Sequence, residues 1–259
     1  MLPLQGLRIA VTRPRGQAGS LIEGLERLGA EAIHCPTIRI VEDEVAPGLR
    51  RAIGELESFD WIVFTSANGV RVFWKALRAV RARAALPARL RVAAIGPATG
   101  RALGEHGVNP TLIPDEYVAE AVADALTGVD DLTGRRVLLP RAAGARKALP
   151  ERLQTAGARV DEVAVYESLP DEEGIERLRG AVERGGVDMI TFTSASTVRC
   201  FVDAAGPDVG EARIAAIGPI TAAVARELGM LVDVEAEEYT VEGLLRAISQ
   251  FYGEGGDES

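Results

Sequence analysis

Short apolar runs alternate with amphipathic segments along the chain. The runs IAV (9–11) and IVF (62–64) are typical of buried strands, and each ends in a small or polar turn that leads into a helical pattern. Apolar residues recur at helical spacing after both turns: Leu21, Leu25 and Leu28, then Val70, Phe73, Trp74 and Leu77. This order predicts parallel sheets covered by helices on both faces, with the strand-to-helix turns along one edge.

Four sequence blocks occur twice, in the same order. RIAVTRPRG from residue 8 matches RVLLPRAAG from residue 136, and DWIVFTSANGV from residue 60 matches DMITFTSASTV from residue 188, both at an offset of 128. RVAAIGPATG (from 91) matches RIAAIGPITA (from 213), and DEYVAEAV (from 115) matches EEYTVEGL (from 237), both at an offset of 122. The matches indicate one α/β module written twice. We expect the working site in the cleft between the two copies.

Two stretches depart from this alternation of predicted strands and helices. Residues 38–44 (IRIVEDE) and 163–170 (VAVYESLP) occupy equivalent positions in the two copies and are extended patterns that run into polar sequence. We interpret both as connectors. The Gly- and acid-rich tail, residues 253–259, is expected to be frayed.

The composition disfavours several classes of partner and of active site. A formal net charge of −9 disfavours nucleic acid and anionic membranes as partners, although a local field can still attract a small anion. With two cysteines and two histidines, the chain is poorly supplied for a metal site or a His-based triad. The sequence shows neither a signal-peptide pattern nor a run of 18 apolar residues, so we expect a cytoplasmic protein.

The turns carry the candidate binding residues. TSAN (65–68), TSAS (193–196), GPAT (96–99) and GPIT (218–221) each follow a predicted strand and open a helix. Exposed amides and the helix dipole attract anions at such positions. The candidates are Ser66, Asn68, Thr99, Ser194, Ser196 and Thr221. Ordinary helix capping by the same residue types is the alternative.

Three further side chains are candidates for chemistry. Arg13 and Arg141 occupy matching strand ends, and a guanidinium can bind both oxygens of a carboxylate. Solvated surface charge is the alternative for both arginines. Tyr166 lies in the second connector, where its hydroxyl could donate a proton or a hydrogen bond, or where its ring could simply be half-buried. No phosphate-binding loop, G-x-G-x-x-G motif or G-x-S-x-G elbow is present.

Taken together, VTRPRG, IVFTSANGV, AAIGPATG, VAVYES, ITFTSAST and AAIGPITAAVARELG resemble the uroporphyrinogen-III synthase family over nearly the whole chain. The resemblance implies an α/β fold of two similar lobes, each a flavodoxin-like parallel sheet flanked by helices, joined by a two-stranded hinge. Lobe one would comprise residues 1–38 and 168–259, lobe two residues 43–163, and the hinge strands about 38–43 and 163–168. Each lobe would hold the first block of one copy and the later blocks of the other.

The resemblance also implies a reaction. The family cyclises hydroxymethylbilane, a linear tetrapyrrole with eight carboxylates, with inversion of ring D and loss of water. It implies no cofactor and no metal, a monomer, and a transient contact with the preceding enzyme of the pathway. Tyr166 matches the hinge tyrosine that assists hydroxyl departure, Thr99 and Thr221 match two cleft threonines, and Ser66 and Ser194 match the FTS serines. Asn68 stands where some relatives carry a basic residue.

Two other function classes stay open from the residues alone. A two-lobed small-molecule binding module would leave the same repeat, although such receptors are commonly exported and no export signal is present. A nucleotide-dependent transferase is disfavoured because the phosphate-binding loops are missing.

Overall fold

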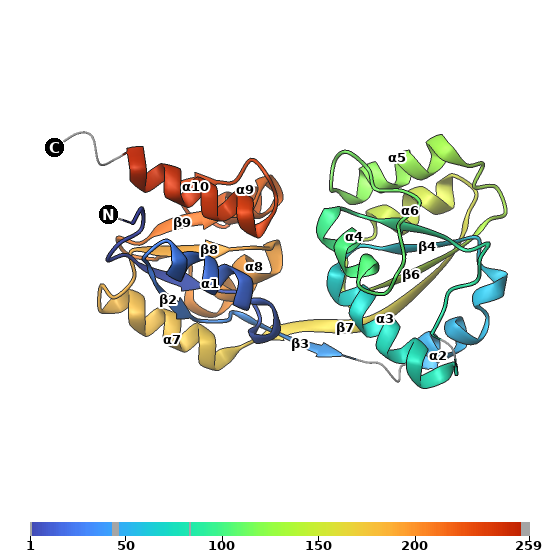
Figure 1. Ribbon diagram of the computed structural model, residues 1–259, viewed down its shortest axis with the longest axis horizontal. Coiled ribbons are helices and arrows are strands. Elements are labelled where there is room, and N and C mark those ends of the chain that lie inside the picture. Colours follow the sequence, from blue (N-terminus) through green and yellow to red (C-terminus); the bar gives the residue numbers. More distant parts are fainter. Residues whose placement is uncertain (1, 43–46, 83, 255–259) are drawn as a thin grey trace. The chain divides into compact units, whose positions relative to one another are not determined.

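The computed structural model describes residues 2–42, 47–82 and 84–254, which form two five-stranded sheets (Figure 1). The chain divides into two compact units: unit 1 is Met1–Ile40 with Ser168–Ser259, and unit 2 is Val41–Glu167. Alternating strands and helices give the α/β fold expected from the apolar pattern, and that prediction is confirmed.

Unit 1 contains a sheet in the order β10-β9-β8-β1-β2. Its strands are β1 (Arg8–Val11), β2 (Glu31–His34), β8 (Met189–Phe192), β9 (Arg213–Ala216) and β10 (Val234–Glu235). Its helices are α1 (Gly19–Arg27), α7 (Glu172–Glu183), α8 (Ala195–Ala205), α9 (Pro219–Glu227) and α10 (Val241–Glu254), with the 3-10 turn η1 (Arg15–Gln17). Neighbouring strands in this sheet run parallel, so the strand-to-helix turns meet at its carboxyl edge.

Unit 2 contains a sheet in the order β3-β7-β6-β4-β5. Its strands are β3 (Ile38–Glu42), β4 (Trp61–Phe64), β5 (Arg91–Ala94), β6 (Arg136–Ala142) and β7 (Arg159–Pro170). Its helices are α2 (Pro47–Gly54), α3 (Ala67–Val80), α4 (Pro97–Gly104), α5 (Ala119–Val129) and α6 (Ala148–Thr155), with the 3-10 turn η2 (Leu56–Ser58). Strand β4 runs parallel to β5 and β6, and β6 runs parallel to β7.

Each sheet joins strands from both copies of the repeat. Strand β1 of the first copy pairs with β8 of the second, and β6 of the second copy pairs with β4 of the first. An aspartate fixes each junction: Asp188 accepts a hydrogen bond from the amide of Arg8 at 2.7 Å, and Asp60 accepts one from the amide of Arg136 at 2.9 Å. The side chain of Arg8 also binds Asp188, and this hydrogen bond holds the pKa of the carboxyl below its usual value.

Side chains from alternate strand positions build a core on each face of the unit 1 sheet. Ile9, Val11 and Met189 pack with residues of α1 and α10 on one face. Ile190 and Phe192 pack with residues of α7, α8 and α9 on the other. Because successive strand residues point to opposite faces and both faces are covered, β1 from Ile9 to Val11 and all of β8 are buried, including the polar Thr191.

Unit 2 is built in the same way. Trp61, Val63 and Leu139 pack with residues of α5 and α6 on one face. The aromatic side chains Phe64 and Phe73 meet edge to face at 5.4 Å between ring centroids, which anchors α3 on β4. The ring of His106 stacks on Trp74 at 4.8 Å. The apolar spacing predicted for residues 70–77 therefore faces the core.

The second connector is extended, and it belongs to a strand that begins earlier than the sequence pattern indicates. Strand β7 begins at Arg159 and is hydrogen-bonded along β6 as far as Tyr166, so Tyr166 lies within a sheet. An apolar run that ends in polar sequence does not reveal how long a strand stays paired, because pairing depends on a neighbour distant in sequence. In the first connector, β3 ends at Glu42, and Asp43 lies outside the described residues, as do residues 255–259 of the predicted frayed tail.

None of the helices in the part of the chain that the structure describes is both long and apolar enough to cross a lipid bilayer.

Gly174 in α7 provides a test of the packing between α7 and the segment that follows β2. A Cβ atom at this position would lie 2.0 Å from the carbonyl oxygen of Pro36, so Gly174→Ala must displace backbone. We expect a loss of about 1–3 kcal/mol in unfolding free energy, measured by urea denaturation. Gly180→Ala in the same helix meets only the flexible end of Arg184, and we expect it to be neutral or stabilising. Equal effects of the two substitutions would contradict this packing.

Candidate functional site

Two serines open equivalent helices with the same backbone geometry. Ser66 caps α3 at φ −165° and ψ 153°, and Ser194 caps α8 at φ −164° and ψ 155°. Each hydroxyl oxygen accepts a hydrogen bond from the amide three residues later, Gly69 at 3.0 Å and Thr197 at 3.3 Å. The capping interpretation therefore holds for both, and it leaves the other first-turn amides without helical acceptors.

Ser66 has a second partner on a distant strand, whereas the further contacts of the Ser194 hydroxyl, with Ser196 at 3.0 Å and Thr197 at 3.4 Å, lie within its own helix turn. The hydroxyl of Ser66 lies 2.9 Å from the hydroxyl of Tyr166 on β7. The register of β6 and β7 shifts between Arg141, opposite Ala164, and Ala142, opposite Tyr166, so β7 carries one extra residue here. Such a bulge re-aims the side chains that follow it. No local pattern of apolar and polar residues indicates this bulge.

Tyr166 is buried, with 8 % of its surface exposed. Burial raises the pKa of its phenol, while the hydrogen bond to Ser66 and the positive charge of Arg141 act in the opposite direction. The phenol therefore keeps its proton at neutral pH and can donate a hydrogen bond. Ser66 can at the same time donate to the phenol oxygen, because its own oxygen accepts from Gly69.

Arg141 is tied into unit 2 by its own neighbours. Its side chain is 8 % exposed; one terminal nitrogen lies 3.3 Å from Glu162, and the other donates to the carbonyl of Arg146 at 2.6 Å. Lys147 also binds Glu162, at 3.2 Å. Arg141 thus holds the segment after β6 in place, and its Nε is buried without a hydrogen-bond partner among the described residues.

Arg13 has the same place in the repeat and a different environment. Its Nε is buried without a partner, and within residues 2–42, 47–82 and 84–254 its side chain makes no hydrogen bond or ion pair. The position equivalent to Glu162 is His34, whose ring nitrogen lies 2.9 Å from the carbonyl oxygen of Arg13. Burial lowers the pKa of the Arg13 guanidinium, which nevertheless stays charged at neutral pH. An incoming carboxylate would offset this unpaired charge.

The two Gly-Pro turns form matching helix starts in the two units. Thr99 near the start of α4 is 3 % exposed and Thr221 near the start of α9 is 4 % exposed. Neither hydroxyl makes a hydrogen bond within the described part of the chain. Each hydroxyl oxygen keeps some exposed surface, so it can form a hydrogen bond with an incoming ligand.

The remaining predicted residues are placed as follows. Ser196 lies beside Ser194, with 3.0 Å between the hydroxyl oxygens. Asn68 accepts a hydrogen bond from Arg71 at 3.3 Å, one turn further along α3. Ser66, Asn68, Thr99, Arg141 and Tyr166 belong to unit 2, whereas Arg13, Ser194, Ser196 and Thr221 belong to unit 1. A cleft shared by both sets stays a prediction.

Two residues outside the predicted set lie at these turns. Tyr117 contacts Gly96 before α4, and Tyr239 contacts Gly218 before α9. Neither tyrosine is among the residues predicted from the sequence to bind substrate. The shared spacing of 21 residues between each glycine and its tyrosine was a signal that could have identified them.

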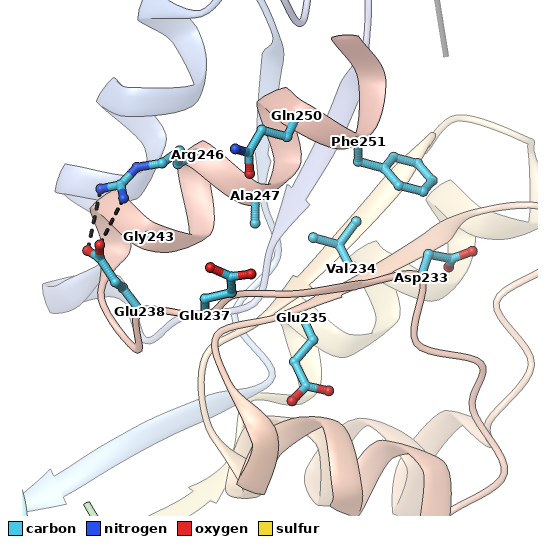
Figure 2. Close-up of a pocket in the computed structure, with 10 residues that line it drawn as sticks. All are labelled: Asp233, Val234, Glu235, Glu237, Glu238, Gly243, Arg246, Ala247, Gln250 and Phe251. Atoms are coloured by element: carbon cyan, nitrogen blue, oxygen red, sulfur yellow. Dashed lines mark hydrogen bonds and ion pairs between the residues drawn. The ribbon is translucent and has the colours of Figure 1, made fainter. Parts of the chain in front are cut away.

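A separate pocket of about 380 Å³ lies in unit 1 between β10 and α10 (Figure 2). Its lining includes Asp233, Glu235, Glu237 and Glu238, and Arg246 is bound to Glu238 at 2.8 Å. Of the residues predicted for the site, none is among the described residues that line it. Its excess of carboxylates opposes a polyanionic ligand.

Comparison with known proteins identifies the family. The family model described as "Uroporphyrinogen-III synthase HemD" matches residues 19–246. The uroporphyrinogen-III synthase of Synechococcus elongatus is 34 % identical over 96 % of this chain and 97 % of its own length. The uroporphyrinogen-III synthase of Chlorobaculum parvum is 31 % identical over 93 % of this chain and 98 % of its own.

Solved structures show the same fold. A mutant uroporphyrinogen III synthase from Thermus thermophilus matches with a TM-score of 0.72 at 23 % identity, covering 96 % of this chain and all of that one. The uroporphyrinogen-III synthetase of Helicobacter pylori matches with a TM-score of 0.58 at 16 % identity, covering 93 % of this chain and 97 % of that one. At these identities the structures support the fold.

The matched serine caps allow the Tyr166 hydrogen bond to be measured. The other contacts of the Ser194 hydroxyl, with Ser196 and Thr197, lie within the same helix turn, so Ser194→Ala should cost about 1 kcal/mol of unfolding free energy, mainly through loss of the cap. Ser66→Ala should cost about 1 kcal/mol more, because it also leaves the buried Tyr166 hydroxyl without this partner. In the Tyr166→Phe background of a double-mutant cycle, Ser66→Ala should lose only the cap and should cost no more unfolding free energy than Ser194→Ala. Equal losses at the two serines, with additive effects in the cycle, would show that the bond contributes nothing.

Proposed function

Because this chain belongs to the uroporphyrinogen-III synthase family, we propose that it cyclises hydroxymethylbilane to uroporphyrinogen III, with inversion of ring D and loss of water. The match to named synthases over nearly the full length of the chain carries this proposal. The product belongs to tetrapyrrole biosynthesis. The α/β architecture shared with solved synthases supports it further.

The reaction needs little acid–base catalysis from the protein. An electron-rich pyrrole can expel its own hydroxyl and leave an azafulvene cation at the terminal ring. Ring D then attacks this centre through its substituted carbon, the spiro intermediate fragments, and the ring recloses in the inverted orientation. Positioning of ring D therefore decides the product, because the bilane closes without inversion when it is free in solution.

Tyr166 is proposed to assist the departing hydroxyl. Its phenol is kept neutral by burial, and its bond to Ser66 fixes the oxygen while leaving the phenol proton able to point to the substrate. Water forms when the leaving oxygen gains that proton, and the proton lost from ring D can later restore the phenol. Arg141 acts here as a positioning residue, since it holds the segment beside Tyr166 and is already paired with Glu162.

The substrate carboxylates are proposed to meet Arg13 and the helix starts. Arg13 offers a charged group that the described chain leaves unpaired. The starts of α3 and α8 offer first-turn amides beside Ser66 and Asn68 and beside Ser194 and Ser196. Thr99 and Thr221 add hydroxyls that make no hydrogen bond within the described residues. These groups oppose the overall negative charge locally, as binding of a polycarboxylate requires.

We further propose that the protein acts as a monomer and receives its unstable substrate from the preceding enzyme by transient contact.

An isomer assay tests the proposed function. Purified protein is mixed with freshly made hydroxymethylbilane, and the oxidised products are separated by chromatography. We expect the type III isomer, with type I from heat-denatured protein as the control. Type I alone from the native protein would overturn the proposal. Tight binding of another small molecule without turnover would then favour a binding module.

Tyr166→Phe tests the role of the phenol. We expect turnover to fall about tenfold or more, because a positioned proton donor is lost. Thermal stability should change little, since the substitution removes one hydroxyl and one bond. Tyr252→Phe, at a half-buried tyrosine of α10, is the matched control and should keep full turnover. Turnover by Tyr166→Phe equal to the control would make Tyr166 structural.

A further inference from the structure

The two units carry the same contact between a glycine and a tyrosine. A Cβ atom added at Gly96 would lie 3.0 Å from Cγ of Tyr117, and one added at Gly218 would lie 2.6 Å from Cδ1 of Tyr239. Both glycines are the N-cap residues of helices, α4 and α9. Their backbone is extended, so glycine is required by the closeness of the ring and not by a special conformation.

A tyrosine placed to cover backbone alone would be expected to be buried. Tyr239 is instead 43 % exposed and Tyr117 is half-buried. The next residue but one after each glycine is also apolar and exposed, Ala98 in one unit and Ile220 in the other. Each helix start is therefore flanked by accessible apolar surface, part of it aromatic.

Polar groups able to bind an anion lie at the same two places. The first-turn amides of α4 and α9 have no carbonyl within their own helix to accept their hydrogen bonds. Thr99 and Thr221, more than nine-tenths buried, have hydroxyls with no hydrogen bond within the described ranges. A ring surface next to amides and a hydroxyl without a hydrogen bond in the described ranges suits a flat ring bearing carboxylates. Two acidic residues directly precede each tyrosine, Asp115 and Glu116 in one unit and Glu237 and Glu238 in the other, so the ligand carboxylate belongs at the helix start and not beside the tyrosine.

We propose that Tyr117 and Tyr239 are substrate-contacting residues, each giving an aromatic surface to one pyrrole ring while the adjoining helix start takes that ring's carboxylate. The inference rests on the proposed function and assigns it two equivalent ring sites, one in each unit. A substrate built from repeated pyrroles matches a protein in which a tyrosine ring and the adjoining helix start occur together twice. The glycines are then needed because a side chain there would push the ring off the helix start.

The experiment compares two replacements at each tyrosine. Tyr239→Phe and Tyr117→Phe keep the ring, whereas Tyr239→Leu and Tyr117→Leu keep apolar cover over the glycine and remove the aromatic face. We expect each Leu variant to raise KM for hydroxymethylbilane by roughly two- to tenfold with kcat nearly unchanged, the range for one lost aromatic pair. Each Phe variant should raise KM less than the matching Leu variant, because it keeps the aromatic face.

A second readout does not depend on turnover. Uroporphyrinogen III should raise the thermal midpoint of the wild type and of the Phe variants more than that of the Leu variants. A lowered midpoint in the Leu variants without product, with KM and product protection unchanged, would make the tyrosines structural and overturn the proposal. If wild-type protein yields type I product alone, the proposed function fails first. If it yields type III while KM stays unchanged in the Leu variants, this inference alone fails.

Discussion

The parallel pairing of each copy's first strand with the other copy's strands is the constraint on which the remaining structure depends. Strand β1 finds β8 as its neighbour, and β6 finds β4, so neither copy can complete a sheet from its own residues. Asp188 and Asp60 fix the starting register of these pairs through the amides of Arg8 and Arg136. A one-residue slip would turn buried side chains to the wrong face of either sheet.

This exchange also sets the chemistry of the site. Tyr166 belongs to the second copy and Ser66 to the first, and they meet because β6 and β7 join the sheet that β4 begins. The contact between Ser66 and Tyr166 holds the oxygen of a neutral phenol in place. The phenol matters as a proton donor because the chain has only two histidines. Both histidines are engaged elsewhere, His34 with the carbonyl of Arg13 and His106 with the ring of Trp74.

The two copies have diverged where their functions differ. Arg141 forms an ion pair with Glu162, whereas the position equivalent to Glu162 beside its counterpart Arg13 carries His34, and the charge of Arg13 is unpaired in the described chain. One arginine therefore organises the backbone beside Tyr166, and the other can receive an anion. The Gly-Pro helix starts have diverged less, since each keeps its threonine and its tyrosine contact.

The alternation of apolar runs and helical patterns determined the α/β class, and the repeat determined which turns are equivalent, because side-chain period and self-similarity are local properties of a sequence. The FTS serines could be foreseen as helix starts for the same reason. Tertiary structure alone decided that Ser66 meets Tyr166, that β7 bulges there, and that Arg141 is paired with Glu162 while Arg13 has no ion pair within the described chain. Those outcomes depend on contacts between residues far apart in the chain, and no local period records them.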